Sequence, residues 1–377
     1  MKNNRTFLEK LLDGAEVKWK PLGKVTDIKT GQSVSKNNIA QNPGIYPVIN
    51  SGREPLGFIN EWNTENDPIG ITTRGAGVGS ITWQEGKYFR GNLNYSVTIK
   101  SEYELNVRFL YHILLHFQKE IHNLCSFTGI PALNASELKK LEIPIPPLPV
   151  QTEIVKILDA LTALTSELTS ELTLRQKQYE YYREKLLSEE ELGKVGFEWK
   201  TLDQISENLD SKRKPITSGL RTSGKIPYYG ASGIVDYVED YIFDGDFLLI
   251  SEDGANLLAR NTPIAFSATG KIWVNNHAHI LKFNSYEERR FIEFYLNKID
   301  LTPYISGAAQ PKLNKKNLNS IKIPIPSIPK QQRIVSILDK FETLTNSITE
   351  GLPLAIEQSQ KRYEYYRELL LNFPGRE

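Results

Sequence analysis

The chain has 377 residues, which is too long for one ordinary hydrophobic core and predicts at least two domains. Its charged fraction of 24%, apolar fraction of 40% and net charge of +1 are those of a globular protein and indicate no particular partner. The single cysteine, Cys125, excludes an internal disulfide and a multi-cysteine zinc site. No apolar stretch approaches 18 residues, so we expect a cytoplasmic protein without a membrane partner.

The first half of the chain opens with Trp19-Lys20 and continues through strand-like segments that are interrupted by glycine and proline. These segments include "IYPVINSG", "PIGITTRGAG" and "NYSVTIK". A helix is predicted over residues 107–124, after Asn106 as its N-cap. An extended "IPIP" segment beginning at Ile143 then leads into a long helical stretch.

The second half repeats this order. It opens with Trp199-Lys200, and its strand-like segments are "IPYYGASG", "FLLISEDGA" and "IWVNNHAHILKF". A helix is predicted over residues 286–299, because Ser285 and Glu288 have the spacing of a capping box. A second "IPIP" segment begins at Ile323 and again precedes a long helical stretch.

The two halves are tandem copies of one unit of about 180 residues. "IPIPPLPVQTEIVKILD" at 143–159 and "IPIPSIPKQQRIVSILD" at 323–339 are identical at eleven of seventeen positions. The same offset pairs "PALN" at 131–134 with "PKLN" at 311–314. After Thr165 and Thr345 the offset grows to 184, so the second copy carries four additional residues, about one helical turn.

Both long stretches follow a heptad pattern, which predicts that they pack as a coiled coil. In copy one the predicted seam consists of Ile154, Leu158, Leu161, Thr165, Leu168, Leu172, Arg175, Tyr179, Tyr182 and Leu186. In copy two the pattern begins at Ile334 and resumes at Tyr363. The four additional residues shift its phase, and Gly351-Leu352-Pro353 lies among them, so a kink or break is expected there.

The hexapeptide "YEYYRE" occurs at 179–184 and again at 363–368, at the far end of each long helix. Its tyrosines either only pack the seam or, at the off-seam positions Tyr181 and Tyr365, offer aromatic faces to a partner protein. "EKLL" at 9–12 repeats "EKLL" at 184–187, so the N-terminus begins where a long helix would end. We therefore expect a circular, pseudo-two-fold arrangement of elements.

Charge is divided between the two kinds of region. Residues 1–150 and 191–330 have net charges of +3 and +2, whereas the helical regions 151–190 and 331–377 have −3 and −1. This difference favours a polyanion that meets the globular domains rather than the helices. A pseudo-dyad also suits duplex DNA.

No catalytic motif is evident. The glycine-rich "GAGVGS" at 75–80 lacks the lysine of a phosphate-binding loop, so a tight turn is the preferred interpretation. His112 and His116 have metal-ligand spacing on a helix but no third ligand nearby, which favours packing. His277 and His279 alternate along a strand and could lie on one face of a sheet or contact DNA.

The tandem pattern "PxLN…IPIPxxPxQ…IVxILD", followed by a long helix, resembles the specificity subunit of type I restriction–modification systems over essentially the whole chain. "IPYYGASGIVDYV" and "EDGAN" in copy two, with "INSGREPLGFI" and "TRGAGVG" in copy one, also resemble the target-recognition domains of that family. The resemblance implies an α+β fold with two target-recognition domains of mixed strands and a short helix, joined by two long helices in an antiparallel coiled coil. The expected segments are domain one at 1–148, a first helical spacer at 149–190, domain two at 191–328 and a second spacer at 329–377.

The resemblance also implies a function. Each domain would read one half of a bipartite duplex DNA target, and the helical pair would set the spacer and dock two methyltransferase subunits. Restriction–translocase subunits would join this core. The chain itself would be non-catalytic and hold no cofactor, with S-adenosylmethionine, ATP and magnesium on the partner subunits.

Candidate DNA contacts are polar or basic residues in the glycine-punctuated loops. They are Arg53, Arg74, Arg90 and Asn92 in copy one, and Ser232, Asn256, Arg260, Lys271, Gln310 and Lys312 in copy two. The alternative from another class is a coiled-coil adaptor that binds proteins through both domains without nucleic acid. A self-contained DNA methyltransferase is disfavoured by the missing motifs.

Overall fold

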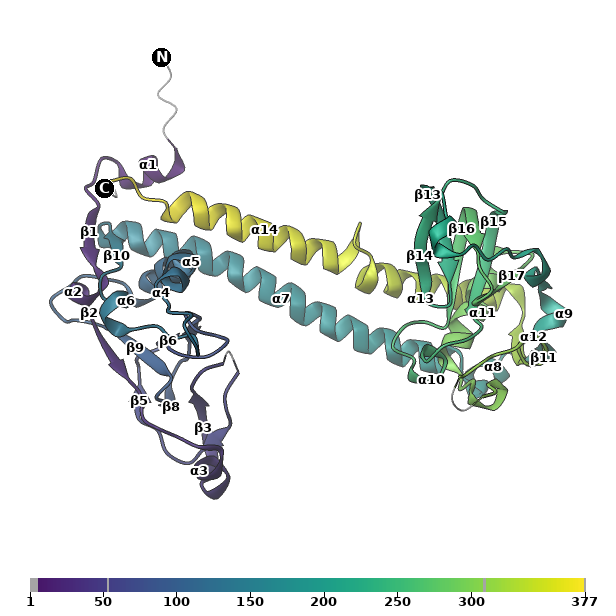
Figure 1. Ribbon diagram of the computed structural model, residues 1–377, viewed down its shortest axis with the longest axis horizontal. Helices are drawn as coiled ribbons and strands as arrows, with labels where there is room; N and C mark the ends of the chain where they lie inside the picture. Colours follow the sequence, from purple (N-terminus) through teal and green to yellow (C-terminus); the bar gives the residue numbers. More distant parts are fainter. Residues whose placement is uncertain (1–5, 53, 308–309, 376–377) are drawn as a thin grey trace, which may run out of the picture. The chain divides into compact units, whose positions relative to one another are not determined.

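A computed structural model describes residues 6–52, 54–307 and 310–375. The chain divides into two compact units (Figure 1). The first unit contains residues up to 168 together with those from 356 onward, and the second contains residues 169–355. Each unit therefore takes its sheets from one copy of the sequence repeat and its long-helix segments from both copies.

The first unit contains a two-stranded ribbon, β1 with β10, and two four-stranded sheets in the orders β2-β9-β6-β7 and β4-β3-β8-β5. Its strands are β1 (Lys18–Pro21), β2 (Thr26–Thr30), β3 (Pro43–Ile49), β4 (Phe58–Ile59), β5 (Thr64–Glu65), β6 (Ile69–Thr72), β7 (Ile81–Trp83), β8 (Lys87–Arg90), β9 (Asn94–Ile99) and β10 (Glu142–Ile145). Its short helices are α1 (Phe7–Leu12), α2 (Leu22–Val25), α3 (Lys36–Gln41), α4 (Val107–His116), α5 (Gln118–Asn123) and α6 (Ala135–Leu138).

The second unit contains a matching ribbon, β11 with β18, and one six-stranded sheet in the order β12-β17-β15-β16-β13-β14. Its strands are β11 (Phe197–Thr201), β12 (Glu207–Asn208), β13 (Ser223–Gly230), β14 (Gly233–Val238), β15 (Phe243–Ser251), β16 (Ala265–Val274), β17 (Ala278–Lys282) and β18 (Lys322–Pro326). Its helices are α8 (Glu189–Gly193), α9 (Leu202–Ile205), α10 (Asn256–Ala259), α11 (Tyr286–Lys298), α12 (Lys315–Asn319) and α13 (Ile328–Asn346), with 3-10 turns η1 (Asp210–Lys212), η2 (Ser218–Leu220) and η3 (Thr302–Tyr304).

The two domains share one strand topology. The ladders β2·β9, β9·β6, β6·β7 and β3·β4 of the first unit correspond to β12·β17, β17·β15, β15·β16 and β13·β14 of the second. The parallel pair β3·β8 corresponds to the parallel pair β13·β16. The long strand β16 thus occupies the positions of both β7 and β8. Because the chain is interrupted between β7 and β8, the first domain has two four-stranded sheets where the second has one six-stranded sheet.

Several boundaries follow the sequence expectations. Asn106 caps α4 by accepting from the backbone N–H groups of Arg108 and Phe109, and Ser285 caps α11 by accepting from Glu288. Two expectations need correction. The helix predicted over 107–124 is divided at Phe117 into α4 and α5. The segment 272–283, which the sequence suggested as one strand, turns between β16 and β17.

The chain is circular in the sense that the repeat predicts. Leu8 and Leu12 of α1 lie in the same buried cluster as Leu370 and Leu371 near the end of α14 (Gly351–Leu371). In the second unit Leu187, the last residue of the other "EKLL", is likewise buried in the core. Each domain is therefore closed by a helix end that comes from the opposite copy or from the other end of the chain.

The aspartate of each "ILD" motif joins a domain helix to a long helix. In the first unit Arg108 Nε on α4 lies 2.9 Å from Asp159 Oδ1 on α7 (Leu148–Leu186). In the second unit Arg290 Nη2 on α11 lies 2.7 Å from Asp339 Oδ1 on α13. Charge-assisted bonds of this kind are stronger than neutral ones and restrict orientation. These arginine–aspartate bonds account for the presence of the "ILD" motif in both copies.

The long helices pack antiparallel within the first unit. Tyr363 of α14 lies close to Asp159 of α7, and further along α7 the Thr165 hydroxyl lies 2.8 Å from that of Ser359. The polar seam position Thr165 therefore has a polar partner. In the second unit Tyr182 of α7 stacks on Phe341 of α13, with ring centroids 5.5 Å apart. These contacts confirm the predicted seam at Thr165 and Tyr182.

The second long helix is broken, as the additional residues predict. The helix α13 ends at Asn346 and α14 begins at Gly351, so the interruption lies at 347–350 and Pro353 falls in the first turn of α14 (Figure 1). Gly351 has φ +82°, and a Cβ there would approach the Thr343 carbonyl oxygen to 2.5 Å. Only glycine fits this position without strain.

We therefore expect Gly351→Ala to destabilise the second unit by about 1–3 kcal/mol, because the new Cβ meets backbone atoms that cannot move aside. Thermal unfolding of the purified chain measures the effect. The control is Gly193→Ala, where a Cβ would meet nothing within 4 Å. Equal unfolding temperatures for Gly351→Ala and wild type would contradict the strained junction.

Candidate nucleic-acid interface

Three loops come together at one edge of the second domain, and we call residues 251–256, 275–277 and 311–313 the second lip. Backbone hydrogen bonds hold them. Leu313 N donates to Glu252 O over 2.7 Å, and Glu252 N donates to His277 O over 2.9 Å. Gly254 N donates to Pro311 O, and Ser306 and Lys312 exchange both of their backbone bonds. The "PKLN" segment is thus fixed against the loop that contains "EDGAN".

The first domain forms an equivalent edge from residues 72–77, 91–93 and 131–133, and we call these residues the first lip. Leu133 N donates to Thr73 O over 2.8 Å, and Thr73 N donates to Leu93 O over 2.9 Å. Gly75 N donates to Pro131 O, and Ser126 and Ala132 exchange both of their backbone bonds. Every backbone bond described for the second lip has a counterpart here.

The side chains on this common backbone differ. The matched bonds make Arg74 equivalent to Asp253, Ala132 equivalent to Lys312, and Leu93 equivalent to His277. One supporting interaction is preserved with different chemistry, because Tyr95 OH donates to Leu133 O and its equivalent His279 Nε2 donates to Leu313 O. The two edges are therefore one scaffold with two different outward surfaces.

A buried charge cluster supports the second lip. Asp210, Glu252 and His279 place ligand-type atoms within 4.8 Å of one another, and the guanidinium of Arg213 enters the group, with Nη1 2.7 Å from Glu252 Oε2. Lys312 Nζ adds an ion pair of 3.2 Å to Glu252. The cationic Arg213 makes this cluster a structural ion-pair network rather than a metal site.

The network fixes the protonation of its acids. Burial raises the pKa of the Asp210 carboxyl, but the bond from His279 and nearby positive charge outweigh it, so the pKa lies below its ordinary value. The pKa of Glu252 is lowered in the same way, because the bond from Arg213 and the charge of His279 outweigh its burial. Both acids are ionised at neutral pH and bind the lip to η1 and β17.

Arg90 has the corresponding supporting role in the first domain. Its side chain is 3% exposed, and its guanidinium donates to Asn94 Oδ1, to the backbone oxygens of Ile69, Tyr95 and Asp67, and to the hydroxyl of Tyr88. Burial raises the pKa of Tyr88 to about 12, so that hydroxyl stays neutral. We predicted a DNA contact for Arg90 from the sequence; its burial argues against that contact and assigns it to the fold.

The other candidates in the first domain are placed as follows. Arg74 and Asn92 are exposed and lie on the first lip. Arg53 lies outside the described residues. "GAGVGS" forms a turn, as predicted, that begins within the first lip and has Gly75 and Gly79 at positive φ.

In the second domain, Lys312 lies on the second lip and is exposed, and Gln310 is exposed just before it. Asn256 is half-buried, and its amide bonds the backbone of Thr262, so it closes the loop rather than facing outward. Ser232 is exposed in the β13–β14 turn, which Ser251 fixes beside the lip through a bond to the Ala231 carbonyl.

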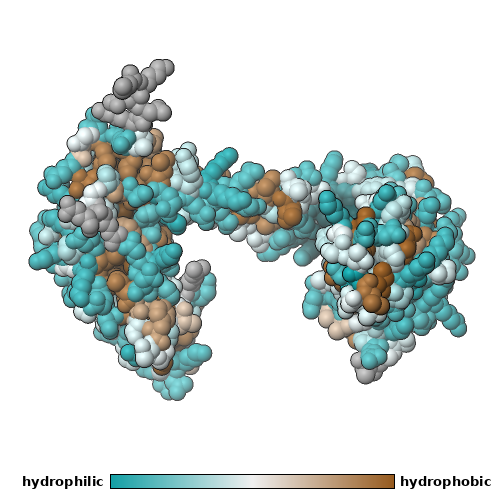
Figure 2. Space-filling view, turned by 45° about the horizontal axis from the view of Figure 1, so that its top comes forward, coloured by the Kyte–Doolittle hydropathy of each residue, from teal (hydrophilic) through white to brown (hydrophobic). Residues whose placement is uncertain are grey.

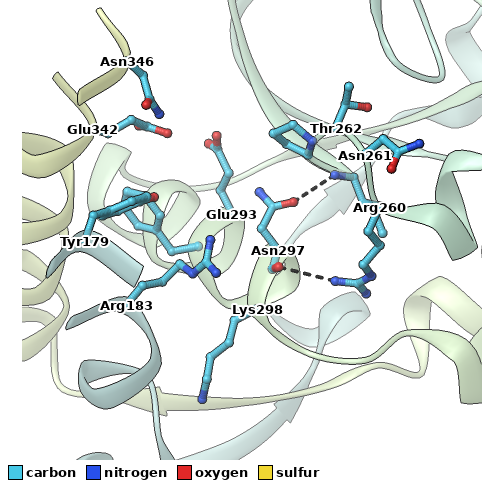
Figure 3. A pocket seen from close by; sticks show the side chains of 13 residues that line it. Tyr179, Arg183, Arg260, Asn261, Thr262, Glu293, Asn297, Lys298, Glu342 and Asn346 are labelled. Carbon is cyan, nitrogen blue, oxygen red and sulfur yellow. Dashed lines mark hydrogen bonds between the residues drawn. The ribbon is translucent and has the colours of Figure 1, made fainter. Parts of the chain in front are cut away.

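Two basic candidates lie away from the second lip. Lys271 is exposed opposite Asp244, at the far end of β15 from Ser251, with its ammonium over the Tyr241 ring. Arg260 lines a cavity of about 450 Å³ between the loop after α10, helix α11 and the long helices (Figure 3). Its guanidinium donates to the Asn297 backbone, and Asn297 Oδ1 accepts from Ile264 N over 2.9 Å.

The off-seam tyrosines are exposed, as the heptad pattern predicts. Tyr181 is 58% exposed and Tyr365 is 63% exposed, and each forms an edge-to-face pair with the following tyrosine. The space-filling view shows a largely hydrophilic surface interrupted by apolar patches on both units (Figure 2). The repeated tyrosine pairs are therefore equivalent aromatic surfaces, one for each copy.

The helical histidines are explained by packing. His112 is buried on α4 with Nε2 2.8 Å from Asp159, and His116 approaches Glu368 of α14. Burial lowers the pKa of both imidazoles despite these carboxylates.

No helix in the described part of the chain is long and apolar enough to cross a membrane.

Asp253 is not among the candidate residues that the sequence indicates. For His277 the sequence leaves two interpretations open, a position on one face of a sheet or a contact with DNA. The candidates that the sequence indicates are polar or basic side chains in loops, and Asp253 is acidic. The signal that could have found it is the internal alignment, which places Asp253 opposite Arg74 once the offset of this loop is taken as 179 rather than 180.

Comparison with known proteins gives a consistent result. Residues 15–175 and 194–358 match the model of the type I restriction modification DNA specificity domain. The chain is 42% identical to a putative type I restriction enzyme specificity subunit of Haemophilus influenzae, covering 99% of this chain and 100% of that one. It is 35% identical to a type I restriction enzyme specificity subunit of Escherichia coli, covering 98% and 97%.

The fold agrees with these relatives. The crystal structure of an S subunit from M. genitalium superimposes with a TM-score of 0.64 at 22% identity, covering 97% of this chain and 98% of that one. The two matches to one family model and the two relatives lead to the same assignment. The chain belongs to the family of type I restriction–modification specificity subunits.

Proposed function

We propose that this chain is the DNA-recognition subunit of a type I restriction–modification complex, and that each domain reads one half of a bipartite duplex target through its lip. The carrying observation is the duplicated backbone frame with different outward side chains. Two equal scaffolds hold two readers at equivalent positions, and unlike surfaces read unlike sequences. Side chains that reach base edges in the major groove provide such readout.

Charge supports this division of roles. The two domains carry net charges of +3 and +2, and the long-helix regions carry −3 and −1. Arg74, Lys312 and Lys271 are exposed on the domains. Phosphate contacts from such residues position a protein on DNA without reading its sequence, so the remaining lip side chains would supply specificity.

The helical pair is proposed to serve the rest of the complex. Tyr181 and Tyr365 present equivalent aromatic surfaces, which suits the docking of two identical methyltransferase subunits. The chain is proposed to be non-catalytic. S-adenosylmethionine would then bind those subunits, and ATP with magnesium would bind the restriction–translocase subunits. The helices would also set the spacer between the two half-sites.

The central test is DNA binding by the chain in complex with its methyltransferase subunits. We expect one asymmetric, bipartite duplex site, because the two lips differ. We also expect affinity to fall steeply with salt; six to ten phosphate contacts would cost about 10³- to 10⁵-fold between 50 and 200 mM. A palindromic motif would contradict two different readers. Binding that is absent or independent of salt would favour the adaptor alternative.

Arg74→Ala should relax recognition in one half-site only, because its side chain is exposed on the first lip, which belongs to the first domain. A lost base contact costs about 1–3 kcal/mol of discrimination. Enrichment of randomised duplexes measures it. Lys140→Ala removes the same charge from an exposed site outside the lip and should keep the motif. Unchanged preferences in both variants would exclude Arg74 as a reader.

The double variant Tyr181→Ala with Tyr365→Ala should lower recovery of the methyltransferase subunit in co-purification while circular dichroism stays unchanged, because both rings are exposed. Tyr237→Ala removes a tyrosine of the second domain that is 51% exposed and serves as the control. Full recovery with the double variant would show that these tyrosines only pack the helices.

A further inference from the structure

The His277 ring is held in a defined orientation on the second lip. Its Nδ1 lies 2.9 and 2.8 Å from the two carboxylate oxygens of Asp253. Its backbone is fixed at both ends, because its N–H donates to Asn275 Oδ1 over 2.8 Å and its carbonyl accepts from Glu252 N over 2.9 Å. Despite these restraints the side chain is 52% exposed. A surface side chain that is both fixed and exposed is suited to recognition.

The Asp253 carboxylate determines which ring nitrogen carries the proton. A carboxylate only accepts hydrogen bonds, so Nδ1 is the donor. Nε2 of the neutral ring is then an acceptor, and no hydrogen bond among the described residues engages it. With the ring neutral, the second lip therefore presents an oriented acceptor to whatever binds it.

His279 shows the contrast. It lies two residues further along the chain, is buried, and uses both ring nitrogens, with Nδ1 2.6 Å from Asp210 and Nε2 2.6 Å from the Leu313 carbonyl. The two histidines are separated by one residue in the sequence. In the structure His279 supports the fold, whereas His277 lies at the surface. Of these two histidines, only His277 has a ring nitrogen that no described hydrogen bond engages.

The first lip shows that this position is not required by the fold. The same backbone bond, from Thr73 N to Leu93 O, is made there with an apolar residue in place of His277 and with Arg74 in place of Asp253. The acid–histidine pair is thus an addition to the common frame. Its chemistry separates the second lip from the first.

We propose that His277 is a specificity-determining residue of the second domain and that Asp253 is its positioning residue. Together they select a base with an exocyclic amino group. In the major groove such donors are N4 of cytosine and N6 of adenine, which match an acceptor at Nε2. This inference rests on the proposed reading of DNA by the lips and names the chemistry that one of them selects.

The test enriches randomised duplexes with the full chain and its methyltransferase subunits. His277→Ala should lower discrimination at one base pair of one half-site by about ten- to a hundredfold and leave the other half-site unchanged. His277→Gln provides a second variant of polar character should the alanine variant fold poorly, and it should also alter the preference at that base pair alone.

Asp253→Asn gives a readout that a purely structural role would not produce. The new amide can donate to Nδ1, which favours the tautomer with the proton on Nε2. Nε2 then becomes a donor, so enrichment should move from cytosine or adenine toward guanine or thymine, whose major-groove oxygens accept, at the same position. Asp246→Asn makes the same charge change at an exposed site near the far end of β15 and should keep the motif.

The outcomes separate the two levels of the proposal. A wild-type complex that enriches no bipartite motif overturns the proposed function and this inference with it. A wild-type motif that persists unchanged in His277→Ala, His277→Gln and Asp253→Asn overturns this inference alone. A change at one position of one half-site, with a shift in base identity for Asp253→Asn, supports it.

Discussion

The pairing of two short backbone segments is the constraint on which each domain depends. Leu133 and Leu313 each donate their backbone N–H to the residue that follows a central strand, and in each case the segment that contains the leucine continues through "IPIP" into a long helix. A backbone group buried without a partner is costly, so these bonds fix where the loop can go. The lip, the ribbon and the start of the long helix are all positioned from this one junction.

The two domains support that junction by different means. The second domain places four ionisable side chains beneath its lip and balances them against one another, with Arg213 between Asp210 and Glu252. The first uses one buried arginine, Arg90, surrounded mainly by backbone carbonyls. Buried charges are tolerated only when they are paired or fully hydrogen-bonded. Polar residues beneath each lip are therefore fixed by the fold, whereas those above it are not.

The sequence predicted the duplication, the helical seam, the helix caps and the break near Gly351, because each depends on local spacing or on one residue type. It did not predict the division of β7 from β8, because sheet registry is settled by contacts distant in the chain. It also placed Arg90 at the surface and overlooked Asp253. Arg90 ends strand β8 rather than lying in a loop, and Asp253 was passed over because it is acidic. Only burial and hydrogen-bond partners show which of the two residues is part of the fold and which lies at the surface.

The backbone origin of the lip has a consequence for how this protein can change. At the positions of Arg74, His277 and Asp253 the frame uses only backbone hydrogen bonds, which residues with other side chains also make. Substitutions at surface sites of this kind usually alter stability by less than about 0.5 kcal/mol. The frame therefore tolerates substitutions at the exposed positions of the lips. Substitutions of the buried polar residues that support each lip would instead be destabilising. Such separation makes the lips evolvable, and it offers protein engineers a small set of positions to diversify without repairing the fold afterwards.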